Sequence, residues 1–546
     1  MVTAVGDTTR RLAVLAILAV GIALRTGSLW RSPLPFNPDG IIYAGLAAHT
    51  LATDALPLAQ MAVDSLAFTS FLAVLAEVTG ATPSTIAQPA VAVVGTATAV
   101  LAIAVTHRLA RRTWSRSRAW TAALLAGTIL AVEGLYLHRS MPVDEQTAGL
   151  LLAPLAVYAV ARSRTDPRYA LLAAPALAVL PVLHNLDTVV TAIAGLCLAA
   201  LALPRDTPRT AFTQVGAGVA FAAYAVVATV AVAAWTPAVI IQADRLTSVP
   251  GLLLAWVLAV TLAVLWLRTA TPRAQRLAVL APFAAGFAIL AANVARPVYP
   301  GLPGTHPWLF AGLAPLAILV IAAAVAVPST RGDAGRAVAA LVAGALALVG
   351  VSVTASLTAP YLNTVYRAQT FIHLPVAVLA GLGAATILDR PRIGTPGRRG
   401  VVVAVLVLAA AASIPVAFAG LELLPYKGTT TPAELAASGH AVQYLAGDWA
   451  SDDHLARITN YYRPNPRFRT EPRASVGLVA AWLTGGQPPP TPTLAQASWT
   501  TTGAQLYPRA PATLPADTYR AWTTTNDVVY AATDPDPIVL VVPAPS

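Results

Sequence analysis

The chain has 546 residues, of which 57% are hydrophobic and only 11% are charged. A soluble globular protein carries about twice that share of charged residues, so the composition excludes that class and indicates a polytopic membrane protein. The formal net charge of +11 comes from arginines in short clusters between apolar segments, which excludes nucleic-acid binding as its explanation because no single basic face results.

Apolar segments long enough to cross a bilayer recur along the chain. Reading them at roughly 20 residues per span predicts about thirteen transmembrane helices. They lie near 12–29, 88–106, 119–136, 147–161, 170–184, 188–203, 211–234, 251–267, 277–293, 308–327, 337–357, 370–388 and 400–421. The fifth and sixth segments are short and meet at "HNLD", which predicts a hairpin that stops partway across the membrane.

The distribution of arginine predicts the orientation. With the N-terminus in the cytoplasm, the inside connections are all arginine-rich: "HRLARRTWSRSR", "RSRTDPR", "PRDTPR", "LRTATPRAQR", "PSTRGDAGR" and "DRPRIGTPGRR". The outside connections are poorer in arginine and begin with a first outer loop at 30–87, in which the stretch 62–79 reads as interfacial. An odd number of spans then places the C-terminal end of the chain outside the cytoplasm.

The composition changes after the last span. We therefore predict a transmembrane domain at 1–421 and a small α/β domain outside the cytoplasm at 422–546. The tail begins with a helix capped by Thr431, with Pro432 in its first turn. The stretch "DVVYAATDPDPIVLVVP" predicts two short strands across a turn.

Acidic residues gather in the two first outer loops, where they are candidates for chemistry. In "FNPDGIIYAGLA", Asp39 could be a general base or an oxygen ligand of a divalent cation. The alternative is that Asp39 caps a helix beginning at Gly40 and Ile41, with Pro38 shaping the turn. In "HRSMPVDEQTAG", His138, Asp144 and Glu145 could hold magnesium or manganese, or the acids could simply begin a helix.

Two further clusters lie at predicted outer membrane ends. His184 in "HNLD" could stabilise a leaving phosphate or complete a metal site, or could belong to a hydrogen-bonded turn. In "YLNTVYRAQTFIH", Arg367 and Tyr366 stand at the outer end of a span, where a guanidinium suits a lipid phosphate. Both residue types are also common interfacial anchors.

Several stretches resemble the membrane-embedded glycosyltransferases of the C superfold, which include mannosyl-, arabinosyl- and aminoarabinose transferases and oligosaccharyltransferases. These stretches are "LAFTSFLAVLAEVTGATPSTIAQPAVAVV", "HRLARRTWSRSRAWTAALLAGTI", "YLHRSMPVDEQTAGLLLAPLAVYAV" and "TPAELAASGHAVQYLAGDWASDDHLARITNYY". The Trp-Trp-Asp-Tyr-Gly signature of oligosaccharyltransferases is absent from the sequence, which argues against transfer of a whole glycan to asparagine.

The resemblance implies an inverting glycosyltransferase of the cell membrane that takes a sugar from a polyprenyl-phosphate donor. The acceptor would be a glycan, lipid or protein outside the cytoplasm. Asp39 would be the catalytic residue, Asp144 and Glu145 the acidic pair of the second loop, and Arg367 the donor-phosphate ligand, with His184 and Tyr366 beside it. The alternatives are a secondary transporter or a flippase for lipid-linked sugars, which would place charges near mid-membrane, and a non-catalytic membrane scaffold.

Overall fold

The structure is a computed structural model that describes residues 7–202, 208–233, 245–246, 248–330, 332–389, 395–445, 447–462, 474–533 and 536–544. The predicted inside connection "PRDTPR" and the outside connection at 236–251 lie largely outside these residues, as do residues 390–394 of "DRPRIGTPGRR".

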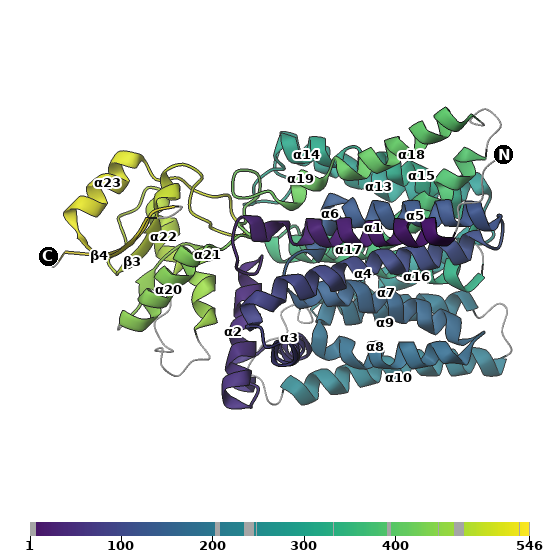
Figure 1. Ribbon diagram of the computed structural model, residues 1–546, viewed down its shortest axis with the longest axis horizontal. Helices are drawn as coiled ribbons and strands as arrows, with labels where there is room; N and C mark the ends of the chain where they lie inside the picture. The colour runs from purple at the N-terminus through teal and green to yellow at the C-terminus, as the bar shows by residue number, and fades with distance from the viewer. Residues whose placement is uncertain are drawn as a thin grey trace.

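Each predicted apolar segment coincides with one helix or with two consecutive helices. These are α1 (Asp7–Arg25), α4 (Pro83–Ala110), α5 (Arg116–Val132), α6 (Gly134–Ser140), α7 (Glu145–Ser163), α8 (Ala170–Leu183), α9 (Asn185–Ala202), α10 (Pro208–Ala233), α12 (Pro250–Leu267), α13 (Pro272–Ala295), α14 (Pro307–Leu313), α15 (Leu316–Ala326), α16 (Gly332–Ala355), α17 (Ala359–Leu388), α18 (Pro396–Ala411) and α19 (Ile414–Ala417). Most run side by side as one elongated bundle (Figure 1).

Among the described residues, seven helices are long and apolar enough to cross a membrane, or eight if α5 and α6, which meet at 63°, count as one broken span. The chain is therefore a multi-pass membrane protein, but the predicted number of thirteen spans is not confirmed. Of the other segments, α1 and α7 carry charged residues near both ends, and α8 is short. Helix α8 has 14 residues, or about 21 Å at 1.5 Å per residue, which is less than the thickness of a bilayer core.

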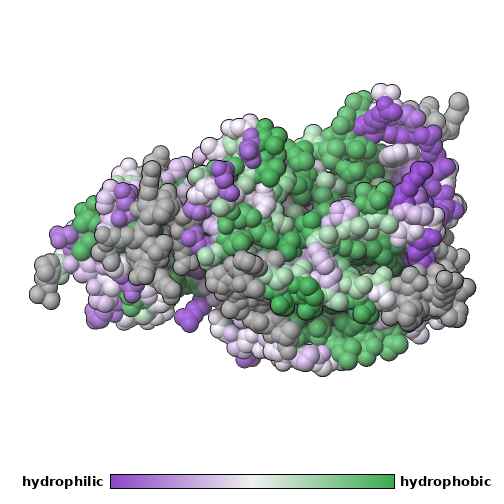
Figure 2. Space-filling model, turned by 90° about the horizontal axis from the view of Figure 1, so that it is seen from below, coloured by the Kyte–Doolittle hydropathy of each residue, from purple (hydrophilic) through white to green (hydrophobic). Residues whose placement is uncertain are grey.

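The ends of the bundle differ in the way the sequence predicts. Ion pairs join different predicted inside connections at one end, with Arg118 2.6 Å from Asp389 and Arg162 3.3 Å from Asp333. On the face seen in Figure 2, hydrophilic residues gather at the end that lies away from the C-terminal domain, and hydrophobic residues cover much of the bundle. Leucines on α12 are also exposed, which suits contact with lipid.

The first outer loop lies at the opposite end of the bundle. It forms η1 (Gly27–Trp30), α2 (Pro38–Thr53), η2 (Leu58–Gln60), η3 (Val63–Ser65) and α3 (Leu66–Thr79). Helix α2 lies across the direction of the bundle, between the bundle and the C-terminal domain (Figure 1). The site described below is built around this helix.

The C-terminal domain contains α20 (Pro432–Tyr444), α21 (Asp453–Ile458), η8 (Thr459–Tyr461), α22 (Val476–Leu483), η9 (Ala497–Thr500) and α23 (Ala516–Thr525) around one sheet. Its strands are β1 (Trp449–Ala450), β2 (Ala474–Ser475), β3 (Thr493–Gln496), β4 (Asp527–Ala532) and β5 (Ile538–Val542), in the order β2-β1-β3-β5-β4. Pairs β1–β2 and β1–β3 are parallel, and β3–β5 and β4–β5 are antiparallel. The predicted helix start at Pro432 is confirmed, since Thr431 and Glu434 form a capping box, and so is the predicted strand pair β4–β5.

Candidate active site

The start of α2 corrects the capping prediction for Asp39. The helix begins at Pro38, and Asn37 is its N-cap, since the Asn37 side chain accepts a hydrogen bond from the backbone N–H of Asp39 at 3.3 Å. Asn37 has a φ of 87° and a ψ of 129°, a positive-φ conformation, outside the left-handed helical region, that residues with a side chain rarely adopt. Asp39 therefore lies within the first turn, and its carboxylate is not used to cap the helix.

The backbone before Asp39 is held by two other parts of the chain. The backbone N–H of Val143, in the second outer loop, donates to the Phe36 carbonyl at 3.0 Å, and that of Asn37 donates to the Gly428 carbonyl at 2.7 Å. The Tyr426 hydroxyl also donates to the Asn37 side chain. The position of Asp39 thus depends on the first loop, the second loop and the segment that enters the C-terminal domain.

The Asp39 side chain lines a cavity of about 240 Å³. The wall of the cavity combines residues of α2, the following loop and η8, namely Asp39, Ile42, Tyr43, Leu46, Gln60, Ala62, Ser65 and Asn460. From the C-terminal domain, Arg457 brings a guanidinium nitrogen within 3.8 Å of an Asp39 carboxylate oxygen. A carboxylate in a partly enclosed cavity beside a cation is a suitable place for proton transfer.

Tyr43 connects this cavity to the acidic pair of the second loop. It lies four residues after Asp39, on the same face of α2, and its hydroxyl donates a hydrogen bond to Glu145. Burial, followed by the nearby charges of Glu145 and Asp64, raises the pKa of Tyr43 well above its usual value. The phenol therefore keeps its proton and can serve as the donor in this contact.

The structure brings together Arg367 and His184, two of the residues predicted to bind the donor phosphate. The guanidinium Nη1 of Arg367 lies 3.2 Å from His184 Nε2. Because a guanidinium can only donate, Nε2 must accept, which leaves the ring proton on Nδ1, 2.9 Å from the Asp187 carboxylate. Glu145 lies 3.8 Å from the same Nε2, so the acidic pair reaches this group as well.

A glycine makes room for Asp187. A Cβ atom at Gly149 on α7 would lie 1.3 Å from an Asp187 carboxylate oxygen, which no arrangement of atoms allows. Asp187 and His184 are both fully buried. Close packing of α7 against the start of α9 therefore fixes the imidazole from behind.

Two arginines near this group have unused donors. Gln146 accepts a hydrogen bond from Arg139 and donates to the Arg367 carbonyl at 3.2 Å, so it joins the two residues. Within the part of the chain that the structure describes, the Nε atoms of Arg139 and Arg367 are buried and have no hydrogen-bond partner. Such donors are costly to bury unpaired, and an anionic oxygen would satisfy them.

The residues predicted to bind a cation are not arranged as one metal site. Asp144 caps α7 by accepting from the Thr147 N–H at 3.1 Å, and Glu145 is engaged by Tyr43. His138 lies on α6, which packs against α19, and it contacts the backbone of Ala417 there. Across the described ranges, no group of three or more His, Cys, Asp or Glu side chains could hold a metal ion.

The side chain of Tyr366 points in a different direction from that of Arg367, because successive residues of a helix are about 100° apart around its axis. Its side chain is 47% exposed, and no hydrogen bond joins it to His184 within the described residues. Its place in the donor-phosphate site therefore stays a prediction.

Sequence reasoning missed three contributors to the site. Tyr43 could have been found, since its spacing of four residues from Asp39 predicts a shared helix face. Asp64, expected at an interface, instead accepts a hydrogen bond from the Asn185 side chain at 3.0 Å and so ties η3 to the "HNLD" turn. No local signal identifies Arg457, because its partner Asp39 lies in a different domain.

No family model matches the sequence, and no curated protein matches it. Among solved structures, the apo oligosaccharyltransferase of Archaeoglobus fulgidus is similar, with a TM-score of 0.51 and 12% identity over 91% of this chain and 70% of that one. The same archaeal protein, AglB, in complex with an inhibitory peptide and a dolichol-phosphate gives a TM-score of 0.49 and 12% identity over 83% of this chain and 63% of that one. ArnT from Cupriavidus metallidurans bound to undecaprenyl phosphate gives a TM-score of 0.38 and 14% identity over 98% of this chain and 99% of that one.

The first of these similarities extends over nearly the whole chain, although the identity is too low to indicate more than a shared architecture. It includes both the helical bundle and the C-terminal part. The predicted resemblance is thereby supported at the level of the fold: this membrane protein shares its overall architecture with the Archaeoglobus fulgidus oligosaccharyltransferase.

Proposed function

We propose that this protein is a glycosyltransferase that transfers a sugar from a polyprenyl-phosphate donor to an acceptor hydroxyl on the side of the membrane where the C-terminal domain lies. The observation that carries the proposal is the Asp39 carboxylate, which is free of helix capping and lines a cavity at that end of the bundle. The fold shared with an oligosaccharyltransferase supports the same reaction class.

In the proposed reaction, Asp39 accepts the proton of the acceptor hydroxyl as its oxygen attacks the anomeric carbon of the sugar. A new carbon–oxygen bond forms, and the bond between the anomeric carbon and the phosphate oxygen breaks. The electron pair leaves with the lipid phosphate. A single displacement of this kind inverts the anomeric configuration.

Arg367 and Arg139 would stabilise the negative charge on the leaving phosphate. Their buried Nε donors, which have no partner in the described structure, supply hydrogen bonds that an anionic oxygen would accept. His184 would hold Arg367 in place, since its Nε2 accepts from Arg367 while Asp187 fixes the ring from the other side. Because the phosphate ester is already a good leaving group, no nucleotide is needed.

The experiment is transfer by the full-length protein reconstituted in liposomes with polyprenyl-phosphate sugars and a panel of acceptor glycans, lipids and peptides. We expect Asp39→Asn to lower transfer by at least about a hundredfold, because it removes the proton acceptor. Asp54→Asn is the matched control, since Asp54 is an exposed residue that ends the same helix.

Equal transfer by wild type and Asp39→Asn would exclude the assigned role of Asp39. A product with retained anomeric configuration would exclude single displacement. If the protein moved lipid-linked sugars across the liposome without forming a new glycosidic bond, the flippase alternative would replace this proposal.

A further inference from the structure

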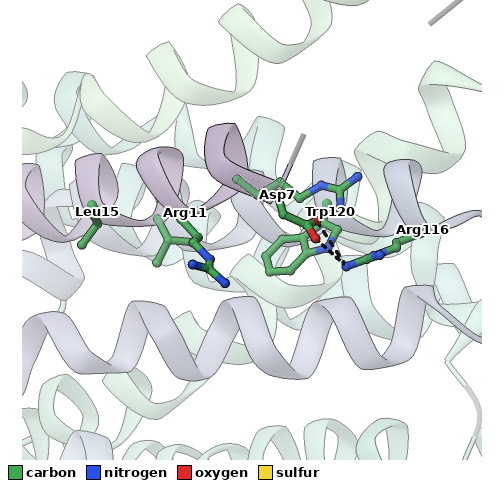
Figure 3. A pocket seen from close by; sticks show the side chains of 7 residues that line it. Asp7, Arg11, Leu15, Arg116 and Trp120 are labelled. Atoms are coloured by element: carbon green, nitrogen blue, oxygen red, sulfur yellow. Dashed lines mark hydrogen bonds and ion pairs between the residues drawn. The ribbon is translucent and has the colours of Figure 1, made fainter. Parts of the chain in front are cut away.

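A second cavity lies at the end of the bundle away from the C-terminal domain, and the proposed reaction does not use it. It has a volume of about 520 Å³ and lies between α1 and α5. Its wall includes Arg10, Arg11 and Arg116, one carboxylate from Asp7, and the indole of Trp120 (Figure 3). These residues come from the first turns of α1 and from the beginning of α5.

The cavity has more positive than negative charge. Asp7 lies 2.7 Å from Arg10 and 3.2 Å from Arg116, so one carboxylate is shared by two guanidinium groups. In the described part of the chain, Arg11 has no ion-pair partner, and Figure 3 shows its side chain beside the cavity, apart from the Asp7–Arg116 pair. With three arginines and one aspartate, the wall of the cavity has a net charge of +2.

A buried donor in the same place is unsatisfied. Arg10 is only 8% exposed and lies over the Trp120 ring at 6.0 Å, yet its Nε is buried without a hydrogen-bond partner among the described residues. An unpaired N–H of this kind is costly to bury. Together with the Arg11 guanidinium, it provides hydrogen-bond donors for an anionic group with several oxygens, such as a phosphate.

The remaining wall of the cavity is apolar and leads onto the outer surface of α1. Val14 and Leu15 line the cavity one turn further along the helix. Leu15 is 59% exposed and Leu12 is 60% exposed, so an apolar strip continues from the arginines toward the middle of the bundle. A free anion would make no favourable contact with this apolar strip. The strip suits the acyl chain of a lipid whose headgroup lies among the arginines.

From this combination we infer that the cavity between α1 and α5 binds one anionic phospholipid of the surrounding leaflet. The phosphate lies between Arg11 and Arg10, and one acyl chain follows Leu12 and Leu15. Asp7 competes with the phosphate for Arg10 and Arg116, so it limits the affinity. The site is separate from Asp39 and does not depend on the proposed transfer reaction.

The test measures binding of phosphatidylglycerol to the delipidated full-length protein by native mass spectrometry. Phosphatidylcholine with the same acyl chains and inorganic phosphate are the comparison ligands. We expect tighter binding of phosphatidylglycerol than of phosphatidylcholine, and no displacement by inorganic phosphate at equal concentration. Arg11→Gln should weaken phosphatidylglycerol binding about fivefold, the effect of one basic residue at a membrane surface.

Two further variants make the result decisive. Asp7→Asn removes the competing carboxylate and should tighten binding, an outcome that damage to the fold would not produce. Arg273→Gln removes an exposed arginine from another predicted inside connection, outside the cavity, and should leave binding unchanged. The inference is wrong if Arg11→Gln and Arg273→Gln bind alike, if Asp7→Asn weakens binding, or if inorganic phosphate displaces the lipid.

Discussion

Arg457 of the C-terminal domain faces Asp39 of the first outer loop, with 3.8 Å between a guanidinium nitrogen and a carboxylate oxygen. Burial alone would lower the pKa of Arg457, but the charges of Asp39 and Asp453 raise it above its ordinary value. The guanidinium therefore stays charged over the whole physiological range. A residue of the C-terminal domain thus completes the surroundings of the proposed catalytic carboxylate.

We expect Arg457→Gln to lower kcat/KM about two- to fivefold, the effect of losing one partly exposed ion pair. Arg457→Lys keeps the charge and should restore part of the loss. Arg509→Gln, an exposed substitution in the same domain, serves as the control. Steady-state kinetics in liposomes separate the effects on kcat and KM, and an unchanged Arg457→Gln enzyme would show that the pair is incidental.

Gly149 is the second point to test, because its missing side chain leaves space for Asp187. Gly149→Ala must displace that carboxylate and with it the His184 ring, so we expect about a ten- to hundredfold loss of transfer, as for other shifts of about 1 Å in an active site. The control is Gly195→Ala on the neighbouring helix, where an added Cβ meets nothing within 4 Å.

If the Gly149 variant is active at the wild-type level, the arrangement of Asp187 and His184 does not matter for transfer. A melting temperature measured on the same samples separates loss of activity from loss of folding.

Asn37 can be tested through its two separate roles, as helix cap and as a residue with positive φ. Asn37→Gly keeps the backbone conformation and should cost a few tenths of a kcal/mol in stability, whereas Asn37→Ala should cost about 1 kcal/mol or more. Thermal unfolding of the detergent-solubilised protein shows which of the two variants loses more stability. Equal costs for both variants would mean that the positive-φ backbone at Asn37 adds no strain.

The surroundings of Glu434 predict that the stability of the C-terminal domain depends on pH. Burial alone would raise its pKa, but His454 and then Lys427 hold the pKa well below the ordinary value of 4.5. Because the folded pKa is lower than the unfolded one, the stabilisation is complete above about pH 4.5 and is lost as the pH falls toward the folded pKa.

We therefore expect Glu434→Gln to destabilise the domain at pH 7 and the difference from wild type to shrink below about pH 4. Hydrogen exchange of α20 in the full-length protein measures this difference. Burial raises the pKa of Asp452, which acts in the opposite direction, but Asp452 is present in both proteins and its contribution cancels. A difference that is constant with pH would contradict the role given to Glu434.

Much of the fold could be predicted because it depends on local patterns. The apolar segments, the capping box at Thr431 and the paired strands after Asp527 each follow from neighbouring residues. The number of spans could not be settled in this way, because a short helix such as α8 has the composition of a span without its length.

The limits of what the sequence says about the candidate site have a common cause. Arg367 and His184 lie within hydrogen-bond distance of each other, and their role at a donor phosphate stays a prediction. The sequence does not show which way a side chain turns. It therefore groups His138 with the acidic pair, although His138 contacts Ala417. It also leaves open helix capping by Asp39 as an alternative to a catalytic role, although Asn37 is the cap. Arg457 depends on how two domains meet, which no local pattern specifies.

The hydrogen bonds between Asn37 and the segment of Tyr426 and Gly428 have a consequence for the order of synthesis. A ribosome makes the first outer loop early, but the groups that hold Asn37, and Arg457 after them, emerge only when every predicted span has been made. An incomplete chain cannot assemble these surroundings of Asp39, so we expect the proposed transfer to require a chain that extends beyond the last predicted span.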